Sequence, residues 1–304
     1  MSGMQRLLQR GRVLLKNGEY AKVADGAAKK GRTVLHSPVS RWHVRQLRTA
    51  DHERVRLVGA AVRRARSGTL SPGERERIDA IASRRSTLRE DDRVISVTDH
   101  GAGTAGSNRS RERMHDGVET RIEVSEAAMC PRRNGQLLFQ LIRHLRPRNV
   151  LELGTSVGMS ALYMASAAAE NESGTVVTLE GADALAEIAS ESFERADLSN
   201  VEIVRGAFRD TLSAVLENRA AFDFAFIDGH HDEIATKQYW NAVASALSNG
   251  SVVVFDDIHW SAGMEQAWSE IRADRRLLPL LDIYGYGIGI RVDDDRRSDA
   301  RNIY

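Results

Sequence analysis

Five apolar stretches of this chain each end in glycine, acid or imidazole residues that could form one binding site. The stretches have the length and composition of buried parallel strands. Because the carboxyl ends of parallel strands meet at one edge of a sheet, ligands collect there. A single acid at such a place is usually a helix cap, but five polar ends at one edge favour a site. In chain order they are Glu152-Leu153-Gly154, Glu180, Gly206-Ala207-Phe208, Asp228-Gly229-His230-His231 and Asp256-Asp257.

The first of these ends belongs to the segment Asn149 to Gly181, which reads as strand, glycine turn, helix and strand. Glu180 stands 22 residues after Gly158, where an acid can accept hydrogen bonds from ribose hydroxyls. The turn E-L-G-T-S-V-G differs from the G-x-G-x-x-G that binds a pyrophosphate, and Glu152 would repel phosphates. The pattern therefore predicts a nucleoside cofactor with a cationic end, such as S-adenosylmethionine.

Alternating strands and helices must position these ends, which predicts an α/β, doubly wound sheet. An antiparallel pair around Gly285 and Gly287 should complete it, and Asn249-Gly250 should end the helix before the fifth strand. We expect strands at 150–153, 175–179, 201–204, 222–227, 251–255, 280–284 and 288–292, and helices at 135–145, 158–169, 182–196, 209–217, 233–247 and 262–272.

Upstream of the sheet we expect short helices, a strand at 94–98 and a helical segment at 122–128. Ser71-Pro72-Gly73-Glu74 is typical of a helix start, and that helix should run to Thr87 with Ile78 and Ile81 buried. The glycine- and serine-rich stretch 99–111 predicts a loop, either linker or lid. The expected organisation is a helical basic region 1–68 (helices 4–16, 20–30 and 40–66), a connecting region 69–130 and a cofactor-binding domain 131–304.

The composition is that of a soluble protein with a real core, since 42% of its 304 residues are hydrophobic. Cys130 is its one cysteine, so no internal disulfide can form. Neither a signal peptide nor an apolar run of about 20 residues is evident. We expect a cytoplasmic protein that does not enter a membrane.

Charge is distributed unevenly, with 25 Lys and Arg against 14 Asp and Glu in residues 1–120. A basic half could bind nucleic acid. These basic residues are scattered, however, without interleaved aromatic residues. We expect residues 1–68 to cover the substrate site or a homodimer interface instead.

From Asn134 to Val292 the chain resembles the class I S-adenosylmethionine-dependent methyltransferases, and among them the catechol and caffeoyl-CoA type O-methyltransferases. The resemblance begins with NGQLLFQLIRHLRPRNVLELGTSVGMS. It implies a Rossmann-like, seven-stranded sheet whose last strand is inserted antiparallel. HSP near residue 36, LSPGE, DHGAG and FDDIHWS are similar to segments of a less studied bacterial methyltransferase group.

The resemblance also implies where the cofactor binds. Glu180 would hold the ribose, and Asp228 would lie beside the cofactor. The adenine would lie beside Gly206, Ala207 and Phe208, and the methionine part among Glu152, Gly154, Ser156, Gly158 and Ser160.

In metal-dependent members of that family, two aspartates and an asparagine bind Mg²⁺, and a lysine is catalytic. Asp228, Asp256 and Asp257 fall on the metal positions, with Asp257 replacing the asparagine, and His231 falls on the lysine position. Oxygen ligands suit a hard divalent cation, and histidine can act as a base near neutral pH. Either the site binds metal with an altered preference or it is a metal-free acid/base site, and we favour the metal.

The leading hypothesis is thus metal-assisted O-methylation of a small molecule. An RNA methyltransferase would use the basic N-terminal half, but no RNA-binding module or N-P-P-Y-type turn is evident. An NAD- or nucleotide-sugar-binding oxidoreductase would need the motif G-x-G-x-x-G in the glycine turn, which reads E-L-G-T-S-V-G instead. A non-catalytic cofactor-binding protein remains an alternative, although the intact polar strand ends argue mildly against it. The sequence does not identify the acceptor.

Overall fold

The computed structural model of the protein describes residues 47, 52–101, 109–128 and 130–293. The chain divides into two compact units, Met1–Arg41 and Trp42–Tyr304. All described residues belong to the second unit. The helices expected at 4–16 and 20–30 lie outside the described residues, as does the first part of the helical segment expected at 40–66.

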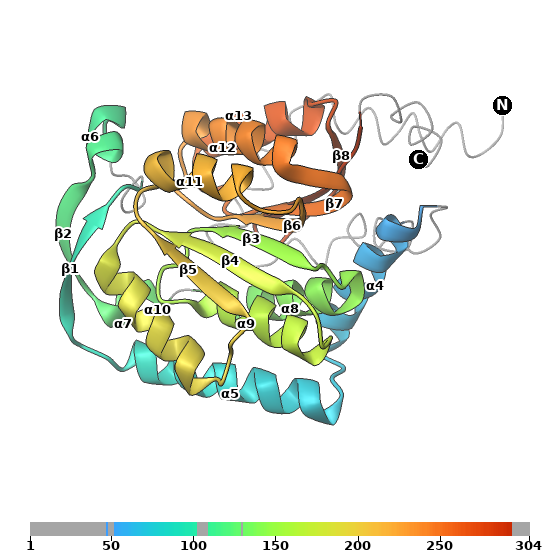
Figure 1. Ribbon diagram of the computed structural model, residues 1–304, viewed down its shortest axis with the longest axis horizontal. Coiled ribbons are helices and arrows are strands. Elements are labelled where there is room, and N and C mark those ends of the chain that lie inside the picture. The colour runs from blue at the N-terminus through green and yellow to red at the C-terminus, as the bar shows by residue number, and fades with distance from the viewer. Residues whose placement is uncertain (1–46, 48–51, 102–108, 129, 294–304) are drawn as a thin grey trace. The chain divides into compact units, whose positions relative to one another are not determined.

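One seven-stranded sheet organises the second unit (Figure 1). Its strand order is β5-β4-β3-β6-β7-β9-β8, and β9 is antiparallel to both of its neighbours. The prediction of a doubly wound sheet with an inserted antiparallel last strand is confirmed. The strands are β3 (Asn149–Leu153), β4 (Thr175–Glu180), β5 (Val201–Arg205), β6 (Phe222–Ile227), β7 (Leu247–Phe255), β8 (Leu277–Ile283) and β9 (Tyr286–Arg291).

Helices cover both faces of this sheet, and Figure 1 shows the two layers above and below it. Strand β3 is apolar apart from Asn149 and Glu152, and β6 apart from Asp223, because the sheet centre is covered on both sides. Helix α9 is buried along nearly its whole length, as expected for an apolar helix against a sheet. One layer contains α8 (Arg132–Leu145), α9 (Met159–Glu170) and α10 (Asp183–Arg195), and the other α11 (Phe208–Glu217), α12 (Glu233–Ala246) and α13 (Ala262–Ala273).

Two local predictions were wrong. Asn249-Gly250 does not end a helix but lies inside β7, because pairing with β6 already begins at Leu247. The ladder shifts register there, and Gly250 adopts a φ of 88°. The segment 122–128 is only partly helical, since its first residues complete a strand that pairs with β1.

That pairing forms a separate two-stranded unit beside the main sheet. It consists of β1 (Val94–Asp99), α6 (Arg111–Asp116) and β2 (Val118–Glu123), and the short α7 (Val124–Ala127) follows it. Strand β1 contacts α10, and Figure 1 shows β1 and β2 at the same side of the molecule as α10. The β1–α6–β2 unit, which is not part of the main sheet, therefore lies beside the connection between β4 and α10.

Two further helices cover the layer that contains α8 and α9. They are α4 (Glu53–Ser67), which packs on α8, and α5 (Pro72–Arg89), which packs on α9. The predicted start of α5 is confirmed, because Ser71 and Glu74 form a reciprocal capping box. Ile78 and Ile81 are buried as expected.

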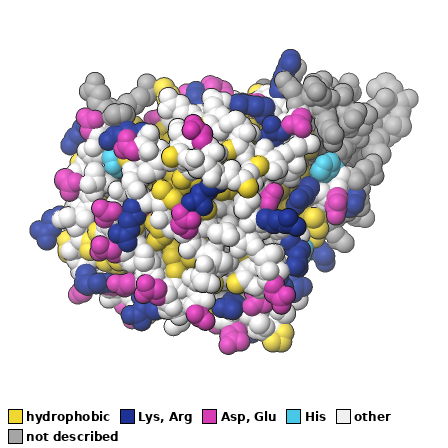
Figure 2. All heavy atoms as spheres, in the orientation of Figure 1, with side chains coloured by type: hydrophobic (Ala, Val, Ile, Leu, Met, Phe, Trp, Pro, Cys, Tyr) yellow, Lys and Arg dark blue, Asp and Glu magenta, His cyan; other side chains and the backbone are white. Residues whose placement is uncertain are grey.

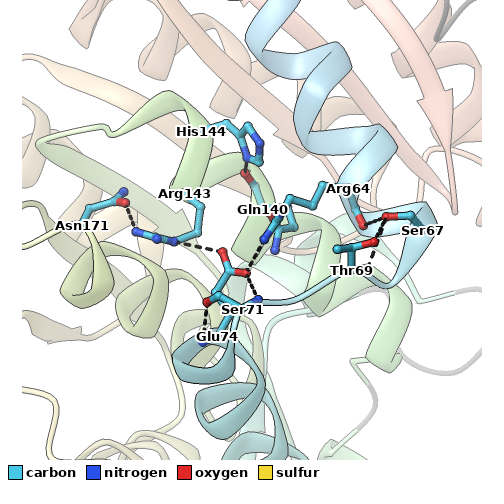
Figure 3. Close-up of polar contacts among 9 residues, drawn as sticks. All are labelled: Arg64, Ser67, Thr69, Ser71, Glu74, Gln140, Arg143, His144 and Asn171. Atoms are coloured by element: carbon cyan, nitrogen blue, oxygen red, sulfur yellow. Dashed lines mark hydrogen bonds and ion pairs between the residues drawn. The ribbon is translucent and has the colours of Figure 1, made fainter.

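Glu74 also joins three helices, as Figure 3 shows. Its Oε2 accepts hydrogen bonds from the Ser71 amide at 2.8 Å and from Nη2 of Arg64 on α4 at 2.9 Å. Its Oε1 accepts from Nε of Arg143 on α8 at 3.4 Å. Burial raises the pKa of this carboxyl, but these partners outweigh it and the net pKa is lowered. The ionised Glu74 therefore stabilises the packing of α4, α5 and α8 against one another.

Charged side chains of both signs are interspersed on the face shown in Figure 2, so that face does not carry a purely basic surface. None of the helices in the described part of the chain is long and apolar enough to cross a membrane.

Glu74→Ala should lower the free energy of unfolding by about 2–4 kcal/mol, because it leaves two partly buried guanidinium groups without their carboxylate. Urea titration at neutral pH would measure the loss. Glu76→Ala, which removes an exposed acid from the same helix, should change stability by less than about 0.5 kcal/mol. Equal effects of the two variants would contradict the role assigned to Glu74.

Candidate functional site

The carboxyl ends of the central strands are tied into one rim by backbone hydrogen bonds. The Asp228 amide donates to the Leu153 carbonyl at 2.9 Å, and the Asp256 amide donates to the Ile227 carbonyl at 2.9 Å. On the other side the Gly206 amide donates to the Glu180 carbonyl at 2.8 Å. The acids predicted to meet at one edge therefore do so.

The glycine turn after β3 is shaped by one close approach. Gly154 has a φ of 100°, and a Cβ placed on it would lie 2.0 Å from the carbonyl oxygen of Asp228. At Gly158, with a φ of 85°, a Cβ would lie 3.0–3.1 Å from Phe193 and Ala189. Only glycine fits at position 154, because the backbone conformation and the lack of space both exclude a side chain there.

Glu180 faces this turn from the end of β4. Its Oε2 accepts a hydrogen bond from the Ser156 amide at 2.7 Å, and its Oε1 accepts from the Ala182 amide at 2.9 Å. Burial raises the pKa of Glu180, and these amides oppose that shift. The carboxylate is thus held at the mouth of the turn by backbone donors.

Glu152 lies beneath the turn and is fully buried. Its Oε2 accepts from the Thr178 hydroxyl at 2.5 Å, whereas its Oε1 has no hydrogen-bond partner. Burial raises the pKa of Glu152 to about 7. An unsatisfied buried carboxylate oxygen costs stability in the free protein, so this atom is suited to a cationic ligand group.

Asp228, Asp256 and Asp257 lie together on the next two strand ends. Burial and then the charges of Asp256 and Asp257 raise the pKa of Asp228 well above its usual value. Burial and the charge of Asp257 raise that of Asp256 to about 7. The raised pKa values of Asp228 and Asp256 show that these neighbouring carboxyl groups disfavour each other's ionisation.

His231 lies beside this acid cluster. Its Nε2 is 3.6 Å from Oδ1 of Asp228 and 4.0 Å from Oδ2 of Asp257. Burial lowers the pKa of His231, against the opposing effect of Asp257. The imidazole is therefore neutral at pH 7. As they stand, no three acidic, histidine or cysteine side chains among the described residues form a group that could hold a metal ion.

Aromatic side chains line the rim beside β5 and β6. The rings of Phe208 and His230 are 5.7 Å apart, and Phe208 and Tyr239 meet edge to face at 5.5 Å. The Tyr239 hydroxyl lies 2.7 Å from Nδ1 of His230. Burial lowers the pKa of His230 to about 4, so this ring is an uncharged wall of the site.

Sequence reasoning missed four side chains that contribute to this region: His100, Cys130, Tyr239 and Tyr286. Burial first, and then the charges of Asp228, Asp256 and Glu152, raise the pKa of the Cys130 thiol. Burial likewise raises the pKa of Tyr286. None of these residues belongs to a polar strand end, so no local pattern marked them.

The geometry agrees with comparisons to known proteins. A methyltransferase domain family matches residues 151–258. A catechol O-methyltransferase of Mycobacterium tuberculosis is 32% identical over 168 residues, which cover 53% of this chain and 74% of that protein. A catechol O-methyltransferase of Niastella koreensis is 33% identical over 126 residues, 41% of this chain and 55% of that protein.

Among solved structures, a methyltransferase of Podospora anserina bound to S-adenosylhomocysteine has the same fold, with a TM-score of 0.53 at 17% identity. The similarity covers 71% of this chain and 88% of that chain. Sheet order, glycine turn and matches together define a methyltransferase of the Rossmann-like class. The chain belongs to the class I S-adenosylmethionine-dependent O-methyltransferases.

Gly154→Ala should lower the free energy of unfolding by about 3 kcal/mol or more, because the new Cβ collides with the Asp228 carbonyl in a strained conformation. Gly285→Ala is the matched control. Gly285 has a similar φ of 89° but nothing within 4 Å of a Cβ, so only the conformational cost of about 1 kcal/mol applies. Thermal and urea unfolding would compare the two. Equal losses would show that the contact with Asp228 is unimportant.

Proposed function

We propose that this enzyme transfers the methyl group of S-adenosylmethionine to the hydroxyl oxygen of a small molecule, with a divalent cation held by the acid cluster and with His231 as the base. The observation that carries the proposal is the position of Asp228 on the rim. Its carbonyl oxygen lies against Gly154 in the glycine turn, and burial together with the charges of Asp256 and Asp257 raises the pKa of its carboxyl group. A cofactor site and an acid/base site would thus share one residue.

The acids around the turn fit S-adenosylmethionine. Glu180 would accept hydrogen bonds from the ribose hydroxyls, and the unpartnered Oε1 of Glu152 would face the cationic methionine end, with Gly154, Ser156, Gly158 and Ser160 around it. The absence of a basic side chain among these turn residues fits a cofactor without phosphate. Gly206, Ala207 and Phe208 would border the adenine.

The acid cluster fits a divalent cation in its chemistry. Three carboxyl groups gather at one place, where burial and their mutual repulsion raise the pKa values of Asp228 and Asp256, and a divalent cation would relieve that repulsion. Asp257 is 40% exposed, so its side chain can change rotamer to complete the ligand set. When bound, such an ion would lower the pKa of the acceptor hydroxyl and orient its oxygen.

His231 would receive the proton. Its lowered pKa keeps the imidazole neutral and able to accept at pH 7. When bound, S-adenosylmethionine would supply the methyl group to the acceptor oxygen and, with its carbon–sulfur bond broken, would leave as S-adenosylhomocysteine. The hydroxyl proton of the acceptor would pass to His231, so that atoms and charge balance.

The surface beside His231 favours a small acceptor with an apolar or planar part. Trp260 is 40% exposed, and its ring lies 5.9 Å from that of His231 at an angle of 39°. Exposed tryptophan next to a reactive group offers a face on which a planar substrate can pack.

Glu180→Ala should weaken binding of S-adenosylhomocysteine by roughly 1.5–3 kcal/mol, because charge-assisted hydrogen bonds to the ribose are lost. Isothermal titration calorimetry would measure this. Glu187→Ala is the control, since the Glu187 side chain on α10 is 70% exposed, and it should leave affinity unchanged. Unchanged affinity in Glu180→Ala would contradict the ribose assignment.

Methylation should require Mg²⁺ or a similar ion and stop when a chelator is added. Asp256→Asn should abolish turnover and should also abolish Mg²⁺ binding, as measured by calorimetry, yet leave S-adenosylhomocysteine affinity nearly intact.

His231→Ala should lower turnover by roughly 10²–10⁴. As the pH decreases, activity should first fall near pH 7, where Asp256 with its pKa of about 7 takes up a proton and loses Mg²⁺. Protonation of His231, whose pKa is lowered, should reduce activity further below the usual imidazole value of about 6.5.

The control for these variants is Asp210→Asn, in which the altered side chain is 64% exposed on α11. Full activity in the presence of chelator, together with an active Asp256→Asn variant, would overturn the proposed metal site while leaving methyl transfer itself in place.

A further inference from the structure

We infer that His100, supplied by the β1–α6–β2 unit, forms a second wall of the nucleoside subsite, beside His230. The inference rests on the proposed cofactor site and adds a residue from outside the main sheet. None of the polar strand ends that define the site includes this residue.

The position of His100 carries the inference. Its Cδ2 lies 3.2 Å from where a Cβ on Gly181 would stand, directly after the ribose acid Glu180. The Cα of Ala207 is 3.8 Å from the same point. His100 therefore reaches the ends of both β4 and β5, between which the nucleoside is expected to bind.

The two imidazoles lie close together at the same strand ends. The His100 and His230 ring centroids are 6.4 Å apart, with an angle of 42° between the rings. Because the rings are not parallel, a purine would contact His100 on one side and His230 on another and would not be stacked between them.

His100 is held in place by its own unit. Nη1 of Arg109 donates to the carbonyl of Asp99 at 3.3 Å and to that of Gly101 at 2.8 Å, on either side of His100. It also pairs with Oδ2 of Asp99 at 2.7 Å. Nδ1 of the His100 ring lies 3.2 Å from the Met114 carbonyl oxygen, so Nδ1 carries the proton that it donates.

This arrangement also explains a glycine in the unit. A Cβ on Gly117 would lie 2.8 Å from Cε1 of His100 and 2.5 Å from Thr98. The chain between α6 and β2 thus leaves space for the imidazole. A ring that is anchored at one nitrogen, flanked by a glycine and directed at two strand ends has the features of a positioned binding residue.

Calorimetry with S-adenosylhomocysteine tests the inference without turnover or metal. His100→Ala should weaken binding roughly three- to tenfold, the range expected for loss of one stacked ring. His100→Phe keeps an aromatic face and should bind within about twofold of the unaltered protein. Adenosine, measured by competition, should lose affinity by the same factor as S-adenosylhomocysteine, because the contact lies at the purine end.

His259→Ala provides the matched control, because it removes an imidazole that is 45% exposed and pairs with Glu265. It should leave affinity unchanged. If His100 only anchored its unit, Ala and Phe variants would bind equally poorly, and that result would overturn the inference. Unchanged binding in His100→Ala would overturn it too, as would tighter binding, which would mean that His100 fills the subsite instead of flanking it.

The same experiment separates this inference from the proposed function. If the unaltered protein does not bind S-adenosylhomocysteine, the cofactor proposal fails. If it binds and Glu180→Ala weakens binding while His100→Ala does not, only the assignment of His100 fails.

Discussion

The close approach of Gly154 to the carbonyl oxygen of Asp228 is the contact on which the site depends. It joins the ends of β3 and β6 at van der Waals distance and forces the chain after β3 into a left-handed turn. That turn directs the Ser156 amide toward Glu180 and begins α9 at Met159. A side chain at position 154 would separate the two strand ends, and with them the cofactor acids from the acid cluster.

A second constraint is electrostatic. The rim gathers four acids, Glu152, Asp228, Asp256 and Asp257, and burial raises the pKa values of the first three. In the free protein, raised pKa values and hydrogen bonds from hydroxyl and amide groups reduce the repulsion among these acids. A site of this kind is suited to binding cations. The methionine end of a sulfonium cofactor and a hard metal ion are the two kinds of cation that the proposed reaction supplies.

The parts outside the sheet have different roles in this arrangement. Glu74 joins α4, α5 and α8 near the carboxyl end of α9, which is the end of that helix away from the glycine turn. The β1–α6–β2 unit lies beside α10 and reaches the rim through His100. The helices joined by Glu74 therefore stabilise the fold, whereas the β1–α6–β2 unit contributes a surface to the proposed site.

Local sequence patterns were sufficient to determine the sheet, its helices and the acids of the rim. Apolar runs of strand length, glycine turns and the capping box of Ser71 and Glu74 act over a few residues, so they can be recognised without knowledge of the fold. The Asn249-Gly250 pair was misread because a glycine with positive φ ends helices and also forms bulges, and only the pairing of Leu247 with Phe222 distinguishes the two. Strand β2 was missed although its residues Val118–Glu123 alternate between half-buried and exposed positions, as in a strand with one covered face. The positions of His100, Cys130 and Tyr239, and the raised pKa values of Asp228 and Asp256, were decided by tertiary structure alone, because they depend on contacts between residues far apart in the sequence.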